Sequence, residues 1–387
     1  MSKGAIYINA LEERRQDRRW RRLRQAYPGA LGERVLDGIP LINFASNDYL
    51  GLSKNPFVKQ RAIQFIEKYG VGSTASRLMS GNLDVYERIE KTLAEMKGTE
   101  AALILPTGFQ TNMTVLPALV GGNALIACDR LSHNSLLQGV VAAKARWFRY
   151  SHNDTNRLAS ELEARGNAAF DNVWLVTESV FGMDGDEAPL DSLRELACRV
   201  DATIYLDEAH ATGVLGEHGM GYAGGDKRCV SMGTFGKGLG GFGAYIACSA
   251  VLKDYLINFA AGLIYSTALP PAVLGAIEAA LELVPSFVNE RRILAEHGEY
   301  LRSGLAKAGF NTGKSSTHII PVLVGSDEAA VNLAAYLEQC GIFAPAIRPP
   351  TVPHNEARIR ISLTIEHTRT QLDYLIKSLK GWHERNH

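Results

Sequence analysis

The sequence predicts an α/β fold in which a mainly parallel central sheet is flanked by helices and followed by a smaller α+β domain. Between residues 83 and 250 helical and strand-like segments alternate, and several of the strands are nearly continuous apolar runs. Alternation of this kind produces right-handed parallel crossovers, and a strand covered on both faces needs no polar side. The 387 residues are enough for a large core and more than one domain.

Three regions are expected along the chain. Residues 1–45 would form an N-terminal helix, predicted over 5–26, and a short strand that pack near the active site. Residues 46–270 would form the large domain and carry the main site, and residues 271–387 would form the C-terminal α+β domain. A dense run of arginines covers one face of the first helix, and such a run is usually a solvated face. One of these arginines could instead hold a carboxylate ligand.

Apolar periodicity and turn residues place the individual elements. The large domain is predicted to contain helices at 56–69, 83–97, 109–120, 133–142, 154–165 and 189–200, and strands at 101–105, 124–128, 145–150, 173–178, 203–207, 229–234 and 245–248. The C-terminal domain is predicted to contain helices at 271–283, 286–308, 327–340 and 367–382, and strands at 319–324 and 357–363.

Composition argues against several classes of partner. Lys+Arg 41 balances Asp+Glu 41, which gives no electrostatic reason to expect nucleic acid or a membrane surface. No apolar run reaches the ~18 residues that a membrane span needs, and no signal-peptide pattern is present. The five cysteines never stand in C-x-x-C spacing, which favours a reducing compartment over a thiolate zinc site. A soluble cytoplasmic enzyme is expected, without a metal.

Chemically useful residues gather at the predicted strand ends. Gly108, Glu178, Asp207, His210 and Lys237 all lie at or just after the end of a strand. Ligands of open α/β sheets bind beyond the carboxyl ends of the strands, so these residues are expected to share one site. Because Gly108 also opens a helix, its backbone is suited to a single phosphate.

Lys237 stands among six glycines between Ser231 and Gly243. Glycine lets a flat ligand approach the backbone, and a desolvated lysine is a nucleophilic amine. An apolar strand that ends in Asp207, followed by this lysine, suits pyridoxal phosphate: the lysine binds the cofactor and the acid pairs with its pyridine nitrogen. A surface turn is the plainer interpretation of the stretch taken alone.

Two motif matches carry little weight. Gly238–Gly243 matches G-x-G-x-x-G, but it lies far from the first strand–helix unit and no acid follows at the spacing that a nicotinamide-dinucleotide site needs. His383–His387 matches H-E-x-x-H, but it stands at the end of the sequence with no third ligand after it.

Several motifs are shared with one enzyme family. They are Asn43–Leu52, Asp129–His133, Met183–Asp186, Asp207–His210, Thr234–Gly238 and Ile264–Thr267. Through them the chain resembles the α-oxoamine synthases, fold-type I pyridoxal-phosphate enzymes, over nearly its full length. Arg348–Pro353 points to the member that condenses L-alanine with a pimeloyl thioester, releasing carbon dioxide and the thiol carrier, in biotin synthesis. The carrier would be coenzyme A or an acyl carrier protein.

The resemblance implies a catalytic set. Lys237 would bind the cofactor and then remove the α-proton of alanine, and Asp207 would pair with the pyridine nitrogen. His133 would stack on the ring. His210 and Thr234 would contact the phenolic oxygen and the phosphate region.

The resemblance also implies the remaining contacts. They are backbone groups of Gly108 and Phe109 at the phosphate, Ser266 and Thr267 at the phosphate of a partner subunit, Arg21 at the pimeloyl carboxylate, Arg360 at the alanine carboxylate, and Thr351 in the acyl pocket. A homodimer with its active site at the subunit interface follows. One departure is Gly182, where relatives commonly carry serine, so a hydroxyl near the cofactor is missing.

Three other activities stay open. A sibling of the same family, such as glycine C-acetyltransferase, 5-aminolevulinate synthase or a serine acyltransferase, would use other substrates. A non-catalytic scaffold that binds pyridoxal phosphate or a carrier protein would lack turnover. An NAD-dependent oxidoreductase of the Rossmann type is the most distant alternative.

Overall fold

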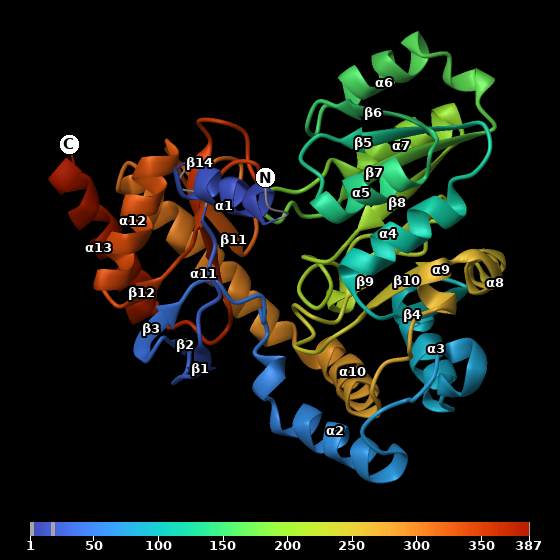
Figure 1. The fold of residues 1–387 in the computed structure, drawn as a ribbon, viewed down its shortest axis with the longest axis horizontal. Coiled ribbons are helices and arrows are strands. Elements are labelled where there is room, and N and C mark those ends of the chain that lie inside the picture. The colour runs from blue at the N-terminus through green and yellow to red at the C-terminus, as the bar shows by residue number, and fades with distance from the viewer. Residues whose placement is uncertain (1–3, 17–19, 387) are drawn as a thin grey trace.

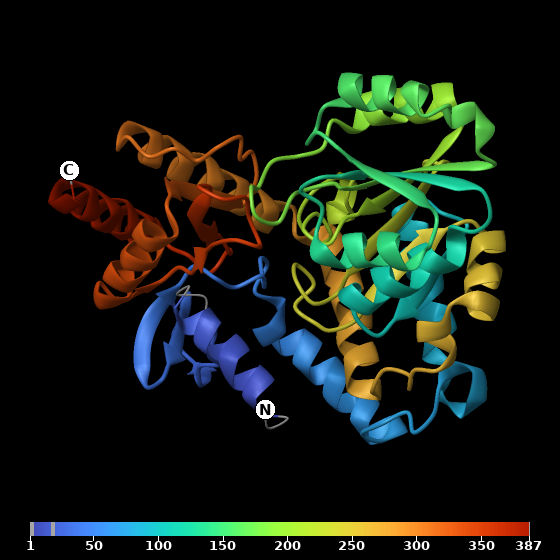
Figure 2. The same cartoon turned by 45° about the horizontal axis from the view of Figure 1, so that its top comes forward.

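A computed structural model describes residues 4–16 and 20–386 of the protein. Two bodies are visible in it (Figure 1), a large domain built around the central sheet and a smaller domain formed by the C-terminal part of the chain. The N-terminal strands lie with the smaller body, so segments from both ends of the sequence contribute to it (Figure 2).

The central sheet has seven strands in the order β4-β10-β9-β8-β7-β5-β6. They are β4 (Ala101–Leu105), β5 (Ala124–Asp129), β6 (Arg146–Tyr150), β7 (Asn172–Glu178), β8 (Ala202–Asp207), β9 (Cys229–Thr234) and β10 (Ala244–Cys248). β10 runs antiparallel to both of its neighbours, and the other strands are parallel to one another. The predicted mainly parallel sheet is therefore confirmed.

Helices cover both faces of this sheet because its strands are apolar on both sides. They are α2 (Pro56–Tyr69), α3 (Val85–Lys97), α4 (Gly108–Leu119), α5 (Asn134–Ala142), α6 (Thr155–Ala164), α7 (Leu190–Val200), α8 (Ala250–Phe259), α9 (Ala261–Ile264) and α10 (Pro271–Leu283). Side chains of α4, α5 and α8 share one core with the sheet, and those of α6 and α7 share another. A third core joins α2, α3 and α10.

The smaller body contains two sheets. Its three-stranded sheet has the order β11-β14-β13, and its four-stranded sheet has the order β1-β2-β3-β12. Its elements are β1 (Ala26–Pro28), β2 (Glu33–Leu36), β3 (Ile39–Asn43), α11 (Val288–Lys307), β11 (Ile319–Gly325), α12 (Asp327–Gln339), β12 (Ile342–Phe343), β13 (Ala346–Ile347), β14 (Ala357–Ser362) and α13 (Arg369–Asn386). The parallel pairing of β3 with β12 joins the N-terminal segment to the C-terminal domain.

The predicted boundary between the two domains at residue 270 differs from the one that the packing shows. α10 packs against α2 in a core of the large domain, whereas α11 contributes Leu294, Leu301 and Leu305 to the core of the smaller one. No single described helix is long and apolar enough to cross a membrane, although the bent pair Pro271–Ser286 and Val288–Lys307 reaches that length and composition jointly.

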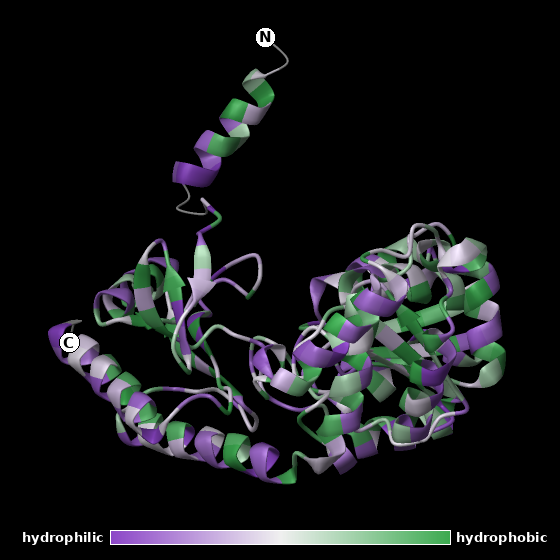
Figure 3. Ribbon diagram, turned by 90° about the horizontal axis from the view of Figure 1, so that it is seen from below, coloured by the Kyte–Doolittle hydropathy of each residue, from purple (hydrophilic) through white to green (hydrophobic). Residues whose placement is uncertain are grey.

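The first helix is shorter than predicted. α1 ends at Gln16, residues 20–25 have no helical structure, and Arg21 therefore does not lie on a helix. None of the α1 side chains is buried, and Figure 3 shows this helix projecting away from both domains. The prediction of one helix over 5–26 is wrong: among the described residues, the apolar side chains of α1 are not buried against any part of the protein, so packing does not extend the helix.

Candidate active site

The carboxyl ends of four strands meet at one edge of the central sheet. β7, β8 and β9 are mutually parallel, and β4 runs the same way because β10 is antiparallel to both β4 and β9. Residues that follow these strands are therefore brought to one side of the sheet. This edge carries Gly108, Glu178, Asp207, His210 and Lys237, as the strand-end positions predict.

Lys237 lies in the glycine-rich loop between β9 and β10. A backbone bond from Phe235 N to Gly243 O, 3.0 Å long, closes this loop. Gly240 has φ +63°, and a Cβ there would stand 2.3 Å from Ser53 N, so this position requires glycine. The loop is thus a packed turn rather than a free surface turn.

The amine of Lys237 has a lowered basicity. Burial lowers its pKa to about 8 and the charge of Arg360 adds to this effect, while the carboxylates of Asp207 and Glu178 oppose it. Nζ lies 2.8 Å from Nε2 of His210. A substantial part of this amine is therefore neutral near pH 8 and available as a nucleophile or base.

His210 receives its orientation from a hydrogen-bonded chain. Its Nδ1 lies 2.6 Å from Oη of Tyr49, and that hydroxyl donates to Oδ1 of Asn47 at 3.1 Å. Burial, reinforced by the charges of Lys237 and Arg360, lowers the pKa of His210 well below its usual value, so the ring is neutral. One assignment satisfies every group: Nδ1–H donates to Tyr49, and Nε2 accepts from the lysine.

Asp207 is buried and held from two sides. Its Oδ2 accepts from Nδ2 of Asn112 at 2.9 Å, and its Oδ1 accepts from the backbone N–H of Ala209 at 2.9 Å. Neighbouring Glu178 is also buried, and burial together with the charge of Asp207 raises its pKa to about 8. Both oxygens of Asp207 are thus held in place by hydrogen-bond donors.

His133 is anchored with its ring exposed toward solvent. Its backbone N–H donates to Oε1 of Glu178 at 2.6 Å, and its Nδ1 accepts from the backbone of Ser135 at 3.2 Å. The ring is exposed, and Phe109 meets it edge-on with ring centroids 6.5 Å apart. An aromatic face fixed in this way can accept a planar ligand.

The start of α4 has free backbone donors. Within the described residues, the amides of Gly108 and Phe109 donate to no protein acceptor, whereas Gln110 N is capped by Thr107 Oγ1 at 3.1 Å. A Cβ at Gly108 would stand 3.1 Å from Cε of Met232, so glycine keeps this helix end close to the strand. These donors suit an anion.

The hydrogen bonds differ among three hydroxyl residues that were predicted to contact the cofactor, Thr234, Ser266 and Thr267. Thr234 donates its hydroxyl to Gly243 O at 2.8 Å and thereby closes the lysine loop. Ser266 accepts from Nε2 of Gln110 at 2.7 Å, which connects it to the start of α4. Thr267 is exposed and its backbone bridges to Ser76.

Arg360 is a buried cation with only neutral partners. It is 6% exposed, and it donates from Nε to Gly182 O and from Nη1 to Ser362 Oγ at 2.7 Å. Asn47 Oδ1 lies 3.4 Å away. Among the described residues no carboxylate forms an ion pair with it. A buried guanidinium without a counterion is suited to an anionic ligand.

Two predicted substrate residues lie apart from this network. Arg21 is exposed, and Thr351 is exposed in the loop before β14. In the described part of the chain, neither forms a hydrogen bond or ion pair with the residues around Lys237.

The packing around residue 182 explains why a glycine stands there. A Cβ at this position would stand 2.5 Å from Nε2 of His210, so the imidazole fills the place of a side chain. The imidazole of His210, which bonds Lys237, therefore occupies the place where the serine side chain of the relatives would begin.

Sequence reasoning assigned no role to Tyr49, Asn47 or Asn112. Tyr49 and Asn47 belong to a motif that carried the family resemblance, and Asn112 follows Gly108 by one helical turn. Tyr49 contacts His210 across 161 positions of the chain, and Asn112 contacts Asp207 across 95 positions. Only the fold reveals such long-range contacts.

The described residues fit pyridoxal phosphate. The site offers an amine of lowered pKa in Lys237, a fixed carboxylate in Asp207, an open aromatic face in His133 and unpaired helix-end amides at Gly108. These are the four functions that the cofactor requires: covalent attachment, a partner for the ring nitrogen, stacking and phosphate binding.

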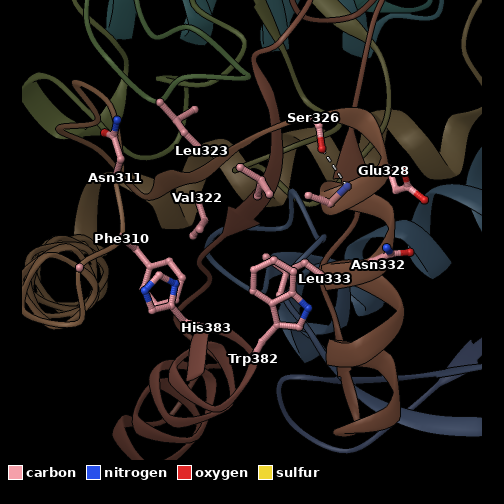
Figure 4. Close-up of a pocket in the computed structure, with 13 residues that line it drawn as sticks. Phe310, Asn311, Val322, Leu323, Ser326, Glu328, Asn332, Leu333, Trp382 and His383 are labelled. Atoms are coloured by element: carbon pink, nitrogen blue, oxygen red, sulfur yellow. Dashed lines mark hydrogen bonds between the residues drawn. The ribbon is translucent and has the colours of Figure 1, made fainter. Parts of the chain in front are cut away.

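A pocket lies in the smaller domain, apart from the Lys237 site. It has a volume of about 460 Å³ and is lined by β11, α12 and α13, with Phe310, Trp382 and His383 on one side (Figure 4). None of its lining residues belongs to the Lys237 site. His383 packs edge-on against Phe310, with centroids 5.6 Å apart. No cluster of three metal-ligating side chains occurs in the described residues, and His387 lies outside them.

Comparison with known proteins agrees with this geometry. Residues 39–379 match the family model for aminotransferase class I and II. A Desulfosudis oleivorans protein provisionally named 8-amino-7-oxononanoate synthase is 48% identical, with 99% of each chain covered. The 8-amino-7-oxononanoate synthase of Gluconacetobacter diazotrophicus is 49% identical, covering 89% of this chain and 88% of the relative.

Solved structures of other enzymes share the fold, and two of them illustrate the similarity. Serine palmitoyltransferase from Sphingomonas wittichii gives a TM-score of 0.91 at 26% identity, covering 99% of this chain and 98% of that one. The 8-amino-7-oxononanoate synthase from Francisella tularensis gives 0.76 at 25% identity, covering 89% and 98%. This chain therefore belongs to the aminotransferase class I and II family and, within it, to the α-oxoamine synthases of fold type I.

Proposed function

We propose that this protein uses pyridoxal 5′-phosphate to condense L-alanine with a pimeloyl thioester, yielding 8-amino-7-oxononanoate, carbon dioxide and the free thiol carrier. The observation that carries the proposal is one hydrogen-bonded chain, Lys237–His210–Tyr49–Asn47, with Arg360 at its far end. An amine base and an anion-binding guanidinium are thereby held in fixed relation. That arrangement suits an amino acid, whose α-proton and carboxylate are separated by one carbon.

The cofactor, when bound, supplies an electron sink for the negative charge that develops on the α-carbon of the amino acid. Lys237 holds the cofactor and then accepts the α-proton at Nζ, for which its pKa of about 8 is suited. Asp207, fixed by Asn112, keeps the ring nitrogen protonated by its negative charge. The helix-end amides at Gly108 and Phe109 hold the phosphate.

The remaining residues orient the substrate. Arg360 binds the alanine carboxylate, and His133 covers the cofactor ring. His210, kept neutral, accepts a hydrogen bond from the lysine and so directs its amine. We assign Arg21 to the pimeloyl carboxylate and Thr351 to the acyl pocket, both as parts of this proposal. A cytoplasmic location belongs to the same proposal.

A homodimer completes the proposed site. Val71, Met79 and Tyr265 are 80%, 79% and 84% exposed. The two segments that carry them are joined by the Ser76–Thr267 bridge and by the bond from Ala268 N to Ala75 O, 3.0 Å long. Exposed apolar residues in such a patch mark an interface, and we propose that a second copy covers it. Thr267 and Ser266 would then approach the phosphate of the other subunit.

The test is a visible spectrum of the purified protein with added cofactor, before and after L-alanine and then pimeloyl thioester, with mass spectrometry of the product. Supporting results are a cofactor absorption band that responds to L-alanine and release of 8-amino-7-oxononanoate with one carbon dioxide. Turnover with glycine or serine instead would assign a sibling reaction, for which the structural similarity to a serine palmitoyltransferase provides a reason. Binding of a nicotinamide nucleotide by a colourless protein would refute the proposal.

A further inference from the structure

Two arginines lie side by side on one strand and face the large domain. Arg358 and Arg360 are separated by one residue on β14, so their side chains point to the same face. They are 1% and 6% exposed. Buried arginines in this number are unusual in a small domain, because each must be compensated by hydrogen bonds or an opposite charge.

The two arginines are compensated differently. Arg358 forms an ion pair with Asp184, and its Nη2 lies 3.2 Å from Oε2 of Glu356. Arg360 has only the neutral partners described above. Asp184 is 27% exposed and Glu356 is 54% exposed, so solvent screens the pair with Asp184 less. Arg358 therefore makes a structural contact, and Arg360 stays available to a ligand.

Both arginines contact the same short segment of the large domain, residues 182–185. Arg360 donates to Gly182 O, and Arg358 pairs with Asp184 two residues further on. Gly185 O accepts from Ser316 N at 3.0 Å and from Oγ1 of Thr317 at 2.9 Å. A Cβ at Gly185 would stand 1.8 Å from Ile319 O, so no side chain can separate the segment from the smaller domain.

The same segment touches the catalytic network on its other side. The backbone of Gly182 packs against the imidazole of His210, which bonds Lys237. Segment 182–185 is thus a spacer between the base in one domain and the carboxylate anchor in the other. Its length and its two arginine contacts define how far Arg360 stands from Lys237.

We propose that Asp184 and Arg358 are positioning residues that hold Arg360 at the distance from Lys237 that an α-amino acid requires. The ion pair contacts no substrate. It fixes the strand β14 against segment 182–185, so that the carboxylate of the amino acid reaches Arg360 while its α-carbon faces the lysine. This inference rests on the proposed function, because it takes the ligand of Arg360 to be an amino-acid carboxylate.

The test compares Asp184→Asn with Glu356→Gln in the full-length protein loaded with cofactor. Asp184→Asn keeps the shape of the side chain and removes its negative charge. Glu356→Gln makes the same change at the exposed partner of Arg358. Binding of L-alanine is measured by spectral titration and by calorimetry, and KM is measured for alanine and for the thioester. We expect Asp184→Asn to raise the Kd and KM for alanine about tenfold, with the thioester KM unchanged, because small misplacements of a bound group are costly. Glu356→Gln should leave both near wild type.

Rescue and a second variant keep the outcome decisive. Asp184→Glu, which restores the charge, should recover part of the alanine affinity. If Asp184→Asn does not fold, Arg358→Lys replaces it, since it keeps the charge and loses the fork geometry, and the same selective loss is expected. Wild-type alanine binding in the variant used, or equal losses for both substrates, would overturn the positioning role.

Arg360→Met separates this inference from the proposed function. If Arg360→Met weakens alanine binding and Asp184→Asn does not, only the positioning role fails. If Arg360→Met leaves alanine binding unchanged, the assigned carboxylate site itself is wrong.

Discussion

The part of the site around Lys237 (the lysine side) and the part around Arg360 (the arginine side) are built by different means. Lys237, Asp207 and His133 all belong to the large domain and follow strands of one sheet, so that sheet fixes them relative to one another. Arg360 belongs to the smaller domain and reaches the site through segment 182–185 and Asn47. On the lysine side the charges are compensated by neighbours within the protein, whereas on the arginine side one buried cation is not.

This difference assigns the two sides to different tasks. A cofactor that stays bound is best held by groups that the fold has already oriented and compensated. A substrate that enters and leaves is suited to a site whose charge is completed only on binding, since the ligand then contributes the missing partner. The boundary between the domains thus separates cofactor binding from substrate recognition.

Replacing the lysine should have the largest effect of any single change. Lys237→Ala removes the amine that holds the cofactor and accepts the proton, so turnover should fall by about 10³-fold or more. The cofactor absorption band should move to that of the free aldehyde, while the fold stays intact. Steady-state assays and visible spectra measure both effects, and Lys59→Ala, on the exposed surface of α2, is the matched control. Wild-type turnover in Lys237→Ala would contradict the assignment.

Replacing the arginine should affect the other side alone. Arg360→Met keeps much of the volume and removes the charge, so kcat/KM for alanine should fall by about 100-fold, corresponding to a lost charge-assisted pair. The cofactor spectrum without substrate should stay unchanged. A changed spectrum would mean that the two sides are less independent than their separate cores suggest.

The same difference explains how much the sequence could predict. Strand ends and glycine-rich turns are local features, and they located Lys237, Asp207, His210 and Gly108 correctly at one edge. The partners that orient them are long-range: Tyr49 meets His210 across 161 positions, and Arg360 meets Gly182 across 178. The end of α1 at Gln16 was also missed, because helical periodicity alone does not show whether an apolar face has anything to pack against.

Removing one hydroxyl should give a smaller effect that tests the chain of hydrogen bonds. In Tyr49→Phe, Nδ1 of His210 loses its partner and the ring can take the other tautomer, whose Nε2–H no longer accepts from Lys237. Turnover should fall about tenfold, as expected for the loss of one buried hydrogen bond. Tyr374→Phe removes a tyrosine hydroxyl that donates to Cys340 O at 2.9 Å and serves as the control. Equal rates in the two variants would show that the tautomer of His210 is fixed by other groups.

The smallest effect should come from His152, which contacts the residues on both flanks of segment 182–185. Its ring lies 2.9 Å from Asp129 and 2.8 Å from Asp186, while Asn153 also donates to Asp186 and Phe181 packs edge-on against the ring. Burial lowers the pKa of His152, but the bonds to both carboxylates outweigh it and raise the pKa to about 9.

The sign of the pH effect follows from this raised pKa. A group whose folded pKa exceeds its unfolded value stabilises the protein fully below the unfolded value, near 6.5, and loses that contribution as pH rises through 9. The Tm should therefore fall by about 3–5 °C between pH 7 and pH 10. In His152→Gln the Tm should be lower at pH 7 and flatter over this range, whereas His218→Gln, whose ring is exposed, should follow the wild type. Parallel curves for wild type and His152→Gln would show that the imidazolium does not stabilise this side of the segment.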